Sequence, residues 1–288
     1  MKRFFVLFFL LSSITFSQEK SPAVNIDLFS LSNIKKFGDY LYCQQDYLRA
    51  IEEYKQYLTK EVNDTIEFKI ALSYSKMGDY KIAAKEFAVI KESSPYYLDS
   101  KLEAMKSLFQ SEDFSTLRDS FKSEWLEKYR GFDKAKSLYS FSFLFTKNTL
   151  PNEQIFLDSF PNEYYAAIKK YYEWKKDPPE KEPITAAILS AIIPGAGKFY
   201  TNEYSDGIWA FLASVGFAYL SYDNFHAKHE FRGWIFGGLA AGFYAGNIYG
   251  AAASAQLYNA KIHFDFVNDL KEFLSSNNYF LSKFNFCK

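Results

Sequence analysis

The chain has 288 residues, and its 34 Lys and Arg are balanced by 34 Asp and Glu. Without a net basic field it lacks the electrostatic footprint of a nucleic-acid-binding protein, so we expect no nucleic-acid partner. Aromatic residues are abundant, at 31 Phe and 23 Tyr, which suits large helical interfaces and membrane-boundary belts.

Residues 1–17 have the form of a secretory signal peptide. Lys2 and Arg3 precede the apolar run from Phe4 to Leu11, and small or polar residues follow up to Ser17. The apolar run is too short to span a membrane comfortably. We predict cleavage near Ser17 and export of the remaining chain.

The two cysteines, Cys43 and Cys287, could pair in an oxidising compartment. They lie far apart in the sequence, and the chain is long enough to fold without a disulfide. We therefore predict that they remain unpaired.

Residues 30–130 show a helical period and an internal repeat. Segments that begin at Gln45, Gly78 and Glu112 align with offsets of 33 and 34 residues. In each segment an aromatic residue is followed by a small or apolar residue and then by a second aromatic residue, a pattern that packs one helical hairpin on the next. The predicted packing residues are Tyr47, Ala50, Tyr54, Tyr74, Gly78, Tyr80, Ala83, Phe87, Pro95, Phe114, Leu117 and Phe121.

This period and spacing resemble the tetratricopeptide repeat (TPR) family. The second copy matches best, with Gly78 at the turn between its helices and Pro95 at its end, whereas the third copy has Leu117 in place of Ala. The resemblance implies an all-α solenoid of helical hairpins whose concave face binds a protein or peptide partner.

The segment after the repeats is predicted to contain further helices and then a domain boundary. Residues 131–175 have helical character and are expected to cap the solenoid. Residues 176–183 are charged and rich in proline, so they cannot continue a helix. We interpret them as a linker.

Residues 184–260 are predicted to form a helical membrane module. A half-helix, 184–193, ends at a tight turn, and two uncharged helices, 207–222 and 233–256, follow as a transmembrane hairpin. Residues 261–288 are expected to form an amphipathic helix and tail. The predicted turn residues are Pro194, Gly195, Gly197 and Tyr200.

Small residues recur at every fourth position in both helices of this hairpin. Such a stripe lets two helix backbones approach closely in lipid, so we predict a glycine zipper. Asn247 lies inside the apolar helix and is expected to hydrogen-bond to a neighbouring helix, through Ser214 or a tyrosine hydroxyl. The predicted contact residues are Ala210, Ser214 and Ala218 on one helix and Gly238, Gly242, Gly246, Asn247, Gly250 and Ser254 on the other.

Two short motifs in this region resemble a small, uncharacterised bacterial membrane module that is often attached to TPR proteins with signal peptides. They are the Pro-Gly-x-Gly-x-x-Tyr turn, Pro194 to Tyr200, and the Tyr-x-Gly-Asn-x-Tyr-Gly segment, Tyr244 to Gly250. The resemblance implies a membrane location and carries no known chemistry.

No residue pattern indicates catalysis. The Gly195-Ala196-Gly197-Lys198 segment lacks the spacing and the Ser or Thr of a phosphate-binding loop. His226 and His229 have no convincing third ligand for a metal ion. We therefore predict no catalytic, cofactor-binding or metal-binding residues, no cofactor and no enzymatic activity.

These observations favour a non-enzymatic adaptor or scaffold of the bacterial cell envelope. We expect TPR-like repeats to be exported and to bind a protein or peptide partner, while the helical module anchors the chain to membrane lipid, in the inner membrane. An alternative is that the membrane module itself is the active part and assists membrane-protein insertion or the passage of a small solute. The repeats would then act only as the recruiter. The oligomeric state stays open.

Overall fold

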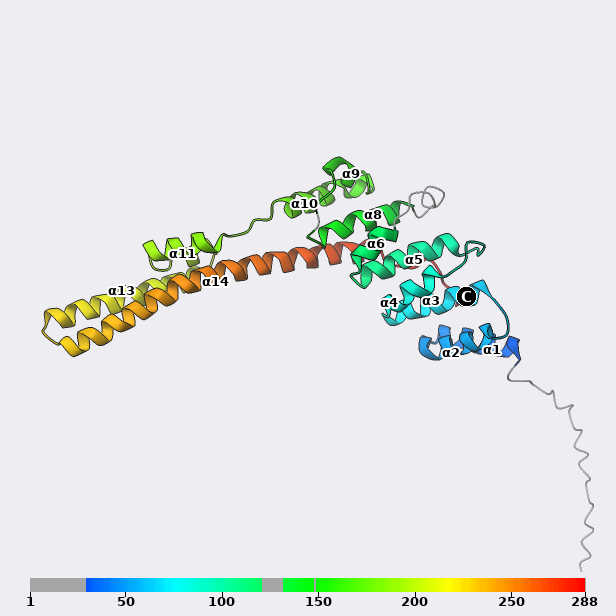
Figure 1. Ribbon diagram of the computed structural model, residues 1–288, viewed down its shortest axis with the longest axis horizontal. Helices are drawn as coiled ribbons and strands as arrows, with labels where there is room; N and C mark the ends of the chain where they lie inside the picture. The colour runs from blue at the N-terminus through cyan, green and yellow to red at the C-terminus, as the bar shows by residue number, and fades with distance from the viewer. Residues whose placement is uncertain (1–29, 121–131, 148, 288) are drawn as a thin grey trace, which may run out of the picture.

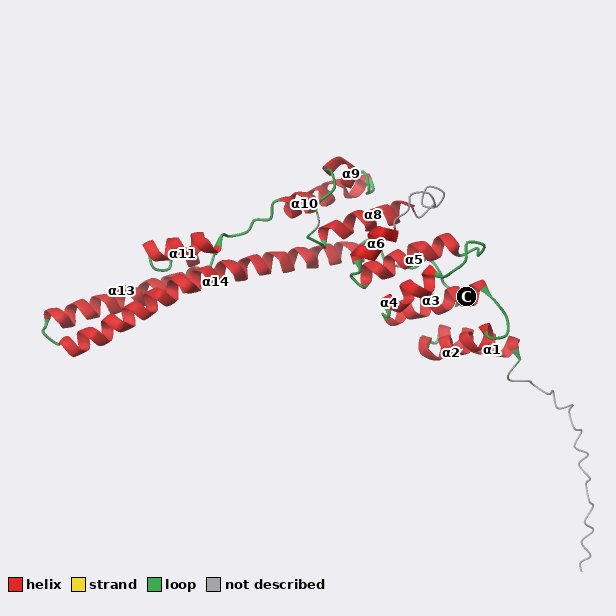
Figure 2. Ribbon diagram, in the orientation of Figure 1, coloured by secondary structure: helices red, strands yellow, loops and turns green. Residues whose placement is uncertain are grey.

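The computed structural model describes residues 30–120, 132–147 and 149–287, and the predicted signal peptide lies outside them. Within this part of the chain the secondary structure is entirely helical, with 13 α-helices and one short 3-10 helix (Figures 1 and 2). The molecule is elongated, with stacked hairpins at one end and a long helical pair at the other (Figure 1).

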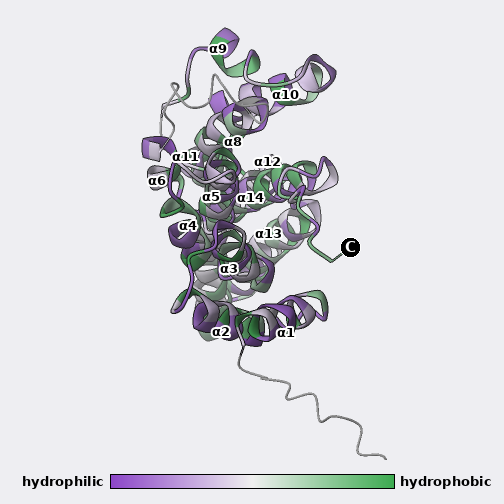
Figure 3. Ribbon diagram, turned by 90° about the vertical axis from the view of Figure 1, so that its right-hand side faces the viewer, coloured by the Kyte–Doolittle hydropathy of each residue, from purple (hydrophilic) through white to green (hydrophobic). Residues whose placement is uncertain are grey.

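The amino-terminal half consists of helices that pack in adjacent pairs (Figure 3). Three repeat-like hairpins follow one another and are covered by a further group of helices. The hairpins are α1 (Leu31–Cys43) with α2 (Tyr47–Leu58), α3 (Asp64–Met77) with α4 (Tyr80–Ala88), and α5 (Tyr97–Gln110) with α6 (Phe114–Ser120). The covering helices are α8 (Phe132–Leu144), α9 (Glu153–Leu157), the 3-10 helix η1 (Asn162–Tyr164) and α10 (Tyr165–Lys176).

Local capping groups set the ends of the hairpin helices. The Asn63 side chain accepts a hydrogen bond from the Ile66 amide at 3.1 Å and begins α3. Asp46 does the same for α2 through the Arg49 amide. Gly78 ends α3 with a φ of 86°, a left-handed conformation that glycine adopts without a steric penalty.

The predicted repeat-packing residues lie mostly inside these hairpins. Tyr47, Tyr74 and Tyr80 are half-buried, and Pro95 is exposed between α4 and α5. Phe121 lies outside the described residues. The fully buried members of the set are Ala50, Tyr54, Ala83, Phe87, Phe114 and Leu117.

The carboxy-terminal half is built on one 47-residue helix, α14 (Glu230–Ser276). At 1.5 Å per residue α14 is about 70 Å long. It includes both the predicted helix 233–256 and most of the predicted amphipathic segment, which form one continuous helix instead of two. The helices that pack on its first half are α11 (Pro183–Ile192), α12 (Ala196–Tyr200) and α13 (Tyr204–His226).

The last turns of α14 belong to the core of the repeat half. Phe266, Leu270 and Leu274 are buried in one apolar cluster with residues of α5, α8, α9 and α10. The Phe266 ring also stacks on Trp174 of α10, with the ring centres 3.9 Å apart. The two halves of the molecule therefore share a single rigid element (Figure 1).

The transmembrane hairpin is not supported. Among the described residues no helix combines the length and the apolarity needed to cross a membrane. In α13 the uncharged run lies between Asp206 and Asp223 and covers about 24 Å, less than the roughly 30 Å of a hydrocarbon core. In α14 glycines, tyrosines and Asn247 dilute the apolar residues.

The predicted glycine zipper is not supported either. A Cβ atom placed on Gly238, Gly242 or Gly246 would meet no other atom within 4 Å. These glycines line an open cavity between α13 and α14. The close contacts between the two helices lie elsewhere, with Gly233 against the Phe225 ring and Gly237 against Ser221. Of the other predicted contact residues, Ala218 is exposed, Ala210 and Gly250 are half-buried, and Ser214 and Ser254 are buried.

Candidate functional site

The last residues of the chain leave α14 and run back across the repeat-like hairpins. The Phe280 ring packs on Phe109 of α5, with the ring centres 5.5 Å apart. The Phe284 ring packs on Phe68 of α3 at 4.7 Å. Residues 279–287, called the tail below, thus cross the first helix of each hairpin in reverse chain order, and the C-terminus lies beside α3 and α1 (Figure 1).

The tail has the side-chain alternation of an extended segment. Leu281, Lys283, Asn285 and Cys287 are exposed, whereas the even-numbered residues between them are half-buried. A period of two places alternate side chains on opposite sides of an extended backbone. The tail therefore presents Phe284 and the next aromatic residue, Phe286, to the helices.

A buried ion pair binds the backbone of the tail. Lys106 and Glu103 of α5 lie 2.8 Å apart, with side chains only 4% and 5% exposed. The Lys106 ammonium also donates a hydrogen bond to the Leu281 carbonyl at 3.1 Å. Close by, Lys283 of the tail pairs with Asp99 of α5 at 2.6 Å.

A second cation lies under the end of the tail. The Lys69 ammonium of α3 is 4.9 Å from the centre of the Phe286 ring and pairs with Asp39 of α1 at 2.6 Å. Burial raises the pKa of Asp39, but hydrogen bonds from Lys35, Lys69 and Tyr54 outweigh it and hold that pKa below its ordinary value. Asp39 therefore stays ionised beside the Lys69 ammonium.

Tyr42 contributes a buried polar group beside the tail. The Tyr42 ring contacts Phe286 with the ring centres 6.3 Å apart, and the residue is 3% exposed. Its hydroxyl finds no hydrogen-bond partner within the described ranges. Burial raises the pKa of this hydroxyl, so it remains a neutral donor. The residues of α1, α3 and α5 that contact the tail, Tyr42, Phe68, Lys69, Asp99, Lys106 and Phe109, are called the tail-binding face.

The cysteines are paired, contrary to the sequence-based expectation. Cys43 is the last residue of α1, and it forms a disulfide with Cys287 at the end of the tail, with the Cα atoms 5.4 Å apart. A separation of 244 residues in the sequence conceals this proximity, which arises because the tail turns back onto the repeat-like hairpins. Both cysteines are exposed to solvent.

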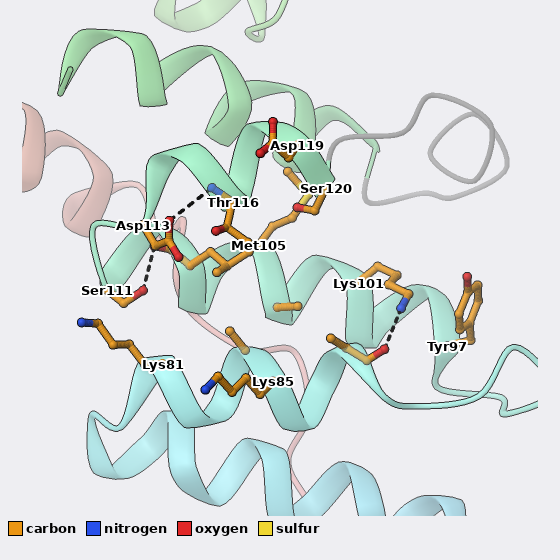
Figure 4. Close-up of a pocket in the computed structure, with 14 residues that line it drawn as sticks. Lys81, Lys85, Tyr97, Lys101, Met105, Ser111, Asp113, Thr116, Asp119 and Ser120 are labelled. Atoms are coloured by element: carbon orange, nitrogen blue, oxygen red, sulfur yellow. Dashed lines mark hydrogen bonds between the residues drawn. The ribbon is translucent and has the colours of Figure 1, made fainter. Parts of the chain in front are cut away.

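The opposite side of α5 has an open cavity of about 740 Å³ between α4, α5 and α6 (Figure 4). At about 100° per residue, positions 101, 104 and 108 lie across the helix from positions 99, 103 and 106. Alanines and Met105 line its apolar part, and Lys81, Lys85 and Asp119 lie around it (Figure 4). We call this cavity the open groove.

Lys101 lies within the open groove and is the most constrained of its cations. It donates a hydrogen bond to the Ala88 carbonyl at 3.1 Å (Figure 4). Burial lowers the pKa of its ammonium group. The groove has an apolar floor with lysines and aspartates around it, so it can accept a ligand that is mainly apolar and carries charged groups at its edge.

The turn at Pro194 is attached to α14 by Asn247. The Asn247 side chain accepts a hydrogen bond from the Gly195 amide at 3.1 Å and donates one to the Ser190 carbonyl at 3.3 Å. These partners differ from the predicted Ser214 or tyrosine hydroxyl. The Ser190 hydroxyl in turn accepts from the Gly197 amide at 3.0 Å, so side chains tie the turn to both α11 and α14.

The hairpin of α13 and α14 exposes a large amount of apolar surface. Phe217 of α13 stacks on Phe243 of α14, but most of the large side chains around them are exposed to solvent. A cavity of about 700 Å³ lies between the two helices and is lined by Ala210, Gly238, Gly242 and Gly246. We call this cavity the hairpin groove. The exposed side chains of the module include Ile184, Ile188, Ile192, Trp209, Leu212, Tyr219, Tyr222, Phe231, Trp234, Tyr249 and Leu257.

The remaining candidate residues do not assemble into a reactive centre. His226 ends α13 and His229 precedes α14. In the part of the chain that the structure describes, no group of three or more His, Cys, Asp or Glu side chains is placed to hold a metal ion. Of the other two turn residues, Pro194 lines a small apolar cavity together with Phe199, and the Tyr200 hydroxyl accepts a hydrogen bond from the Glu182 amide at 3.2 Å.

Comparisons with protein-family models, with curated proteins and with solved structures return no match to this chain.

The tail-binding face was missed by sequence reasoning. The signal that could have found it is the spacing of Phe284 and Phe286, two residues apart, directly before Cys287. That spacing is the period of an extended segment and cannot form one face of a helix.

Proposed function

We propose that the protein is a non-enzymatic adaptor of the bacterial cell envelope, with TPR-like repeats that hold a protein or peptide partner and an apolar helical hairpin that associates with membrane lipid. The signal-like residues 1–17 support export of the repeats. The exposed disulfide between Cys43 and Cys287 supports an oxidising compartment.

The observation that carries this proposal is the continuity of α14. Its first half forms the exposed apolar hairpin with α13, and its last turns place Leu270 and Leu274 in the repeat core. This helix of about 70 Å holds the apolar hairpin away from the repeat core and fixes the position of one relative to the other. This arrangement suits a protein that fixes a partner at a set distance from a surface.

The hairpin is the lipid-associating end. Trp209, Trp234 and Leu257 are each more than two-thirds exposed, at 69%, 72% and 67%. Such side chains would remain in water unless a lipid surface or another protein covered them. A helix can bury its apolar residues at the lipid boundary without crossing the bilayer.

Vesicle flotation tests the lipid-associating end. The purified full-length protein is mixed with vesicles of phosphatidylethanolamine and phosphatidylglycerol, and the fraction that floats is measured. We expect Trp209→Asp and Leu212→Asp to reduce that fraction at least about tenfold, because a buried charge in lipid is costly. Val89→Asp, at a repeat position that is 73% exposed, should float like the wild type. Equal flotation of all variants would contradict the proposal.

Site-specific crosslinking tests the partner-binding end. A photoreactive residue replaces Lys85 in the open groove or Glu173, an exposed residue of α10 outside it. In envelope fractions we expect one discrete crosslinked protein from position 85 and none from position 173. A ladder of products common to both positions would argue against a specific partner.

A second candidate function is assistance to membrane-protein insertion, with the repeats as recruiter. The hairpin groove favours it, because an apolar cavity with the ion pair of Lys198 and Asp206 at its edge suits a segment that is entering lipid. Gly242→Leu would fill this groove. If insertion is the function, this change should abolish the insertion of a reporter membrane protein while leaving vesicle flotation intact.

A further inference from the structure

We propose that the tail is a displaceable occupant of the tail-binding face, that the Cys43–Cys287 disulfide latches it there, and that a thiol reductant opens the face to a partner segment. The partner is an extended polypeptide with two aromatic side chains two residues apart and a basic residue directly before the first. This inference deepens the adaptor function proposed above and rests on it.

The contacts of the tail define the chemistry of the partner. Phe284 and Phe286 rest on aromatic residues of α1 and α3, and Phe68 contacts both, at 4.7 and 6.3 Å between ring centres. Asp99 takes the basic residue that precedes the first aromatic. Lys106 takes a backbone carbonyl from the segment before it. Each of these contacts can be made by a polypeptide from another molecule.

The contacts of the tail are incomplete, so a competing segment can improve on them. The Tyr42 ring contacts Phe286, and its buried hydroxyl has no partner within the described ranges, which is an unfavourable arrangement for a donor. A competing segment that brings a hydrogen-bond acceptor to this point would relieve it. The outward residues Leu281, Lys283, Asn285 and Cys287 remain exposed, so four of the nine tail residues contribute little burial.

The position of the disulfide makes it a latch. The tail is connected to α14 at one end and to α1, through Cys287 and Cys43, at the other. A segment held at both ends rebinds at a high effective concentration, and release of one end lowers that concentration. Both sulfur-bearing residues are exposed, so a thiolate can reach them from solvent.

The opening step is a thiol–disulfide exchange with a dithiol reductant. One thiolate of the reductant attacks a sulfur of the Cys43–Cys287 bond, forms a mixed disulfide and expels the other cysteine as a thiolate. The second thiol of the reductant then attacks the mixed disulfide. The protein gains two electrons and two protons and is left with two thiols, while the reductant becomes a disulfide.

Fluorescence anisotropy on the full-length protein tests the latch. The probe is a labelled peptide with the sequence of residues 279–288 that carries Cys287→Ser. We expect it to bind at least about tenfold more tightly after reduction, because the competing tail is then held at one end only. The C43S/C287S protein should bind the probe with the higher affinity, whether or not a reductant is present. Equal affinity for the oxidised and reduced proteins would overturn the proposal.

A control peptide tests the partner chemistry. Replacing both Phe284 and Phe286 by Ala in the probe should abolish binding to the reduced protein, and binding that survives would overturn the aromatic specificity. Since the reduced protein could lose its fold, a second variant keeps the disulfide and carries F284A/F286A in its own tail. We expect this variant to bind the aromatic probe without a reductant, and failure to do so would also overturn the proposal.

The same samples separate this inference from the adaptor function. Vesicle flotation depends on the hairpin and should not change on reduction. If the protein binds the probe only when reduced but does not float with vesicles, the latch is supported and the membrane adaptor is contradicted. If the protein floats but binds the probe equally in its oxidised and reduced states, the adaptor is supported and the latch is contradicted.

Discussion

The ammonium of Lys69 lies 4.9 Å from the centre of the Phe286 ring and at the same time 2.6 Å from a carboxylate oxygen of Asp39. The Lys69 side chain is only 6% exposed. A cation this deeply buried requires a charged partner, and an aromatic face adds a further attraction. The contact therefore joins α1, α3 and the tail into one unit.

Asp39→Asn should destabilise the repeat half and remove part of its pH dependence. The folded-state pKa of Asp39 is held below its ordinary value, so its contribution is present above the unfolded-state pKa and is lost as the pH falls through the folded-state pKa. We expect a loss of about 1–3 kcal/mol at neutral pH, because Lys69 remains buried. Urea unfolding of both proteins at several pH values measures the difference. It should shrink below about pH 4, and a difference that is constant with pH would contradict this account.

Lys106→Met should be among the most destabilising single changes in the repeat half. It leaves the Glu103 carboxylate buried without its partner, which costs about 3–5 kcal/mol. Adding Glu103→Gln should recover most of the loss, since the double variant has no unpaired buried charge at this position. Urea unfolding of the four proteins gives the coupling energy.

The exposed pair of Lys271 and Glu112, 2.9 Å apart, is the matched control for that cycle. Its side chains are 53% and 62% exposed, so its coupling should stay below about 1 kcal/mol. Similar coupling energies for the two pairs would show that the Lys106 pair is not buried in solution.

Alanine substitutions should have opposite effects on stability at the glycines of the Pro194 turn and at Gly242 of the small-residue stripe. A Cβ on Gly197 would lie 2.0 Å from the Ala186 carbonyl oxygen, and one on Gly195 would lie 2.1 Å from the Gly207 carbonyl oxygen. Both Ala variants should therefore lower the melting temperature. Gly242→Ala faces open space and should raise helix stability by about 1 kcal/mol. A destabilised Gly242→Ala variant would instead show that the stripe packs against another helix.

Asn247→Leu should loosen the turn at Pro194. It leaves the Gly195 amide and the Ser190 carbonyl without their partner, for a loss of about 2 kcal/mol. Hydrogen exchange at the Gly195 amide should become faster. Ser214→Ala is the control, since the Ser214 hydroxyl has no hydrogen-bond partner within the described ranges, and this change should be neutral or stabilising. If Ser214→Ala had the larger effect, the result would favour the contact of Asn247 with Ser214 that the sequence predicted.

The sequence by itself determined where the hairpin helices form. Aromatic and small residues at helical spacing, with polar caps such as Asn63 and the turn glycine Gly78, act over a few residues and are readable locally. The same reasoning found an uncharged segment in α14, but local pattern does not state how a helix rotates against its neighbour.

Only the tertiary structure decided which residues of α14 contact α13, and it left Gly242 in the open hairpin groove, without a close contact. It also decided that Cys43 meets Cys287, because α14 packs into the repeat core and the tail that follows it runs back to α1. Such contacts depend on the summed packing of segments that are distant in the chain, and the free energy that selects them is spread over many side chains. No local sequence pattern records that sum.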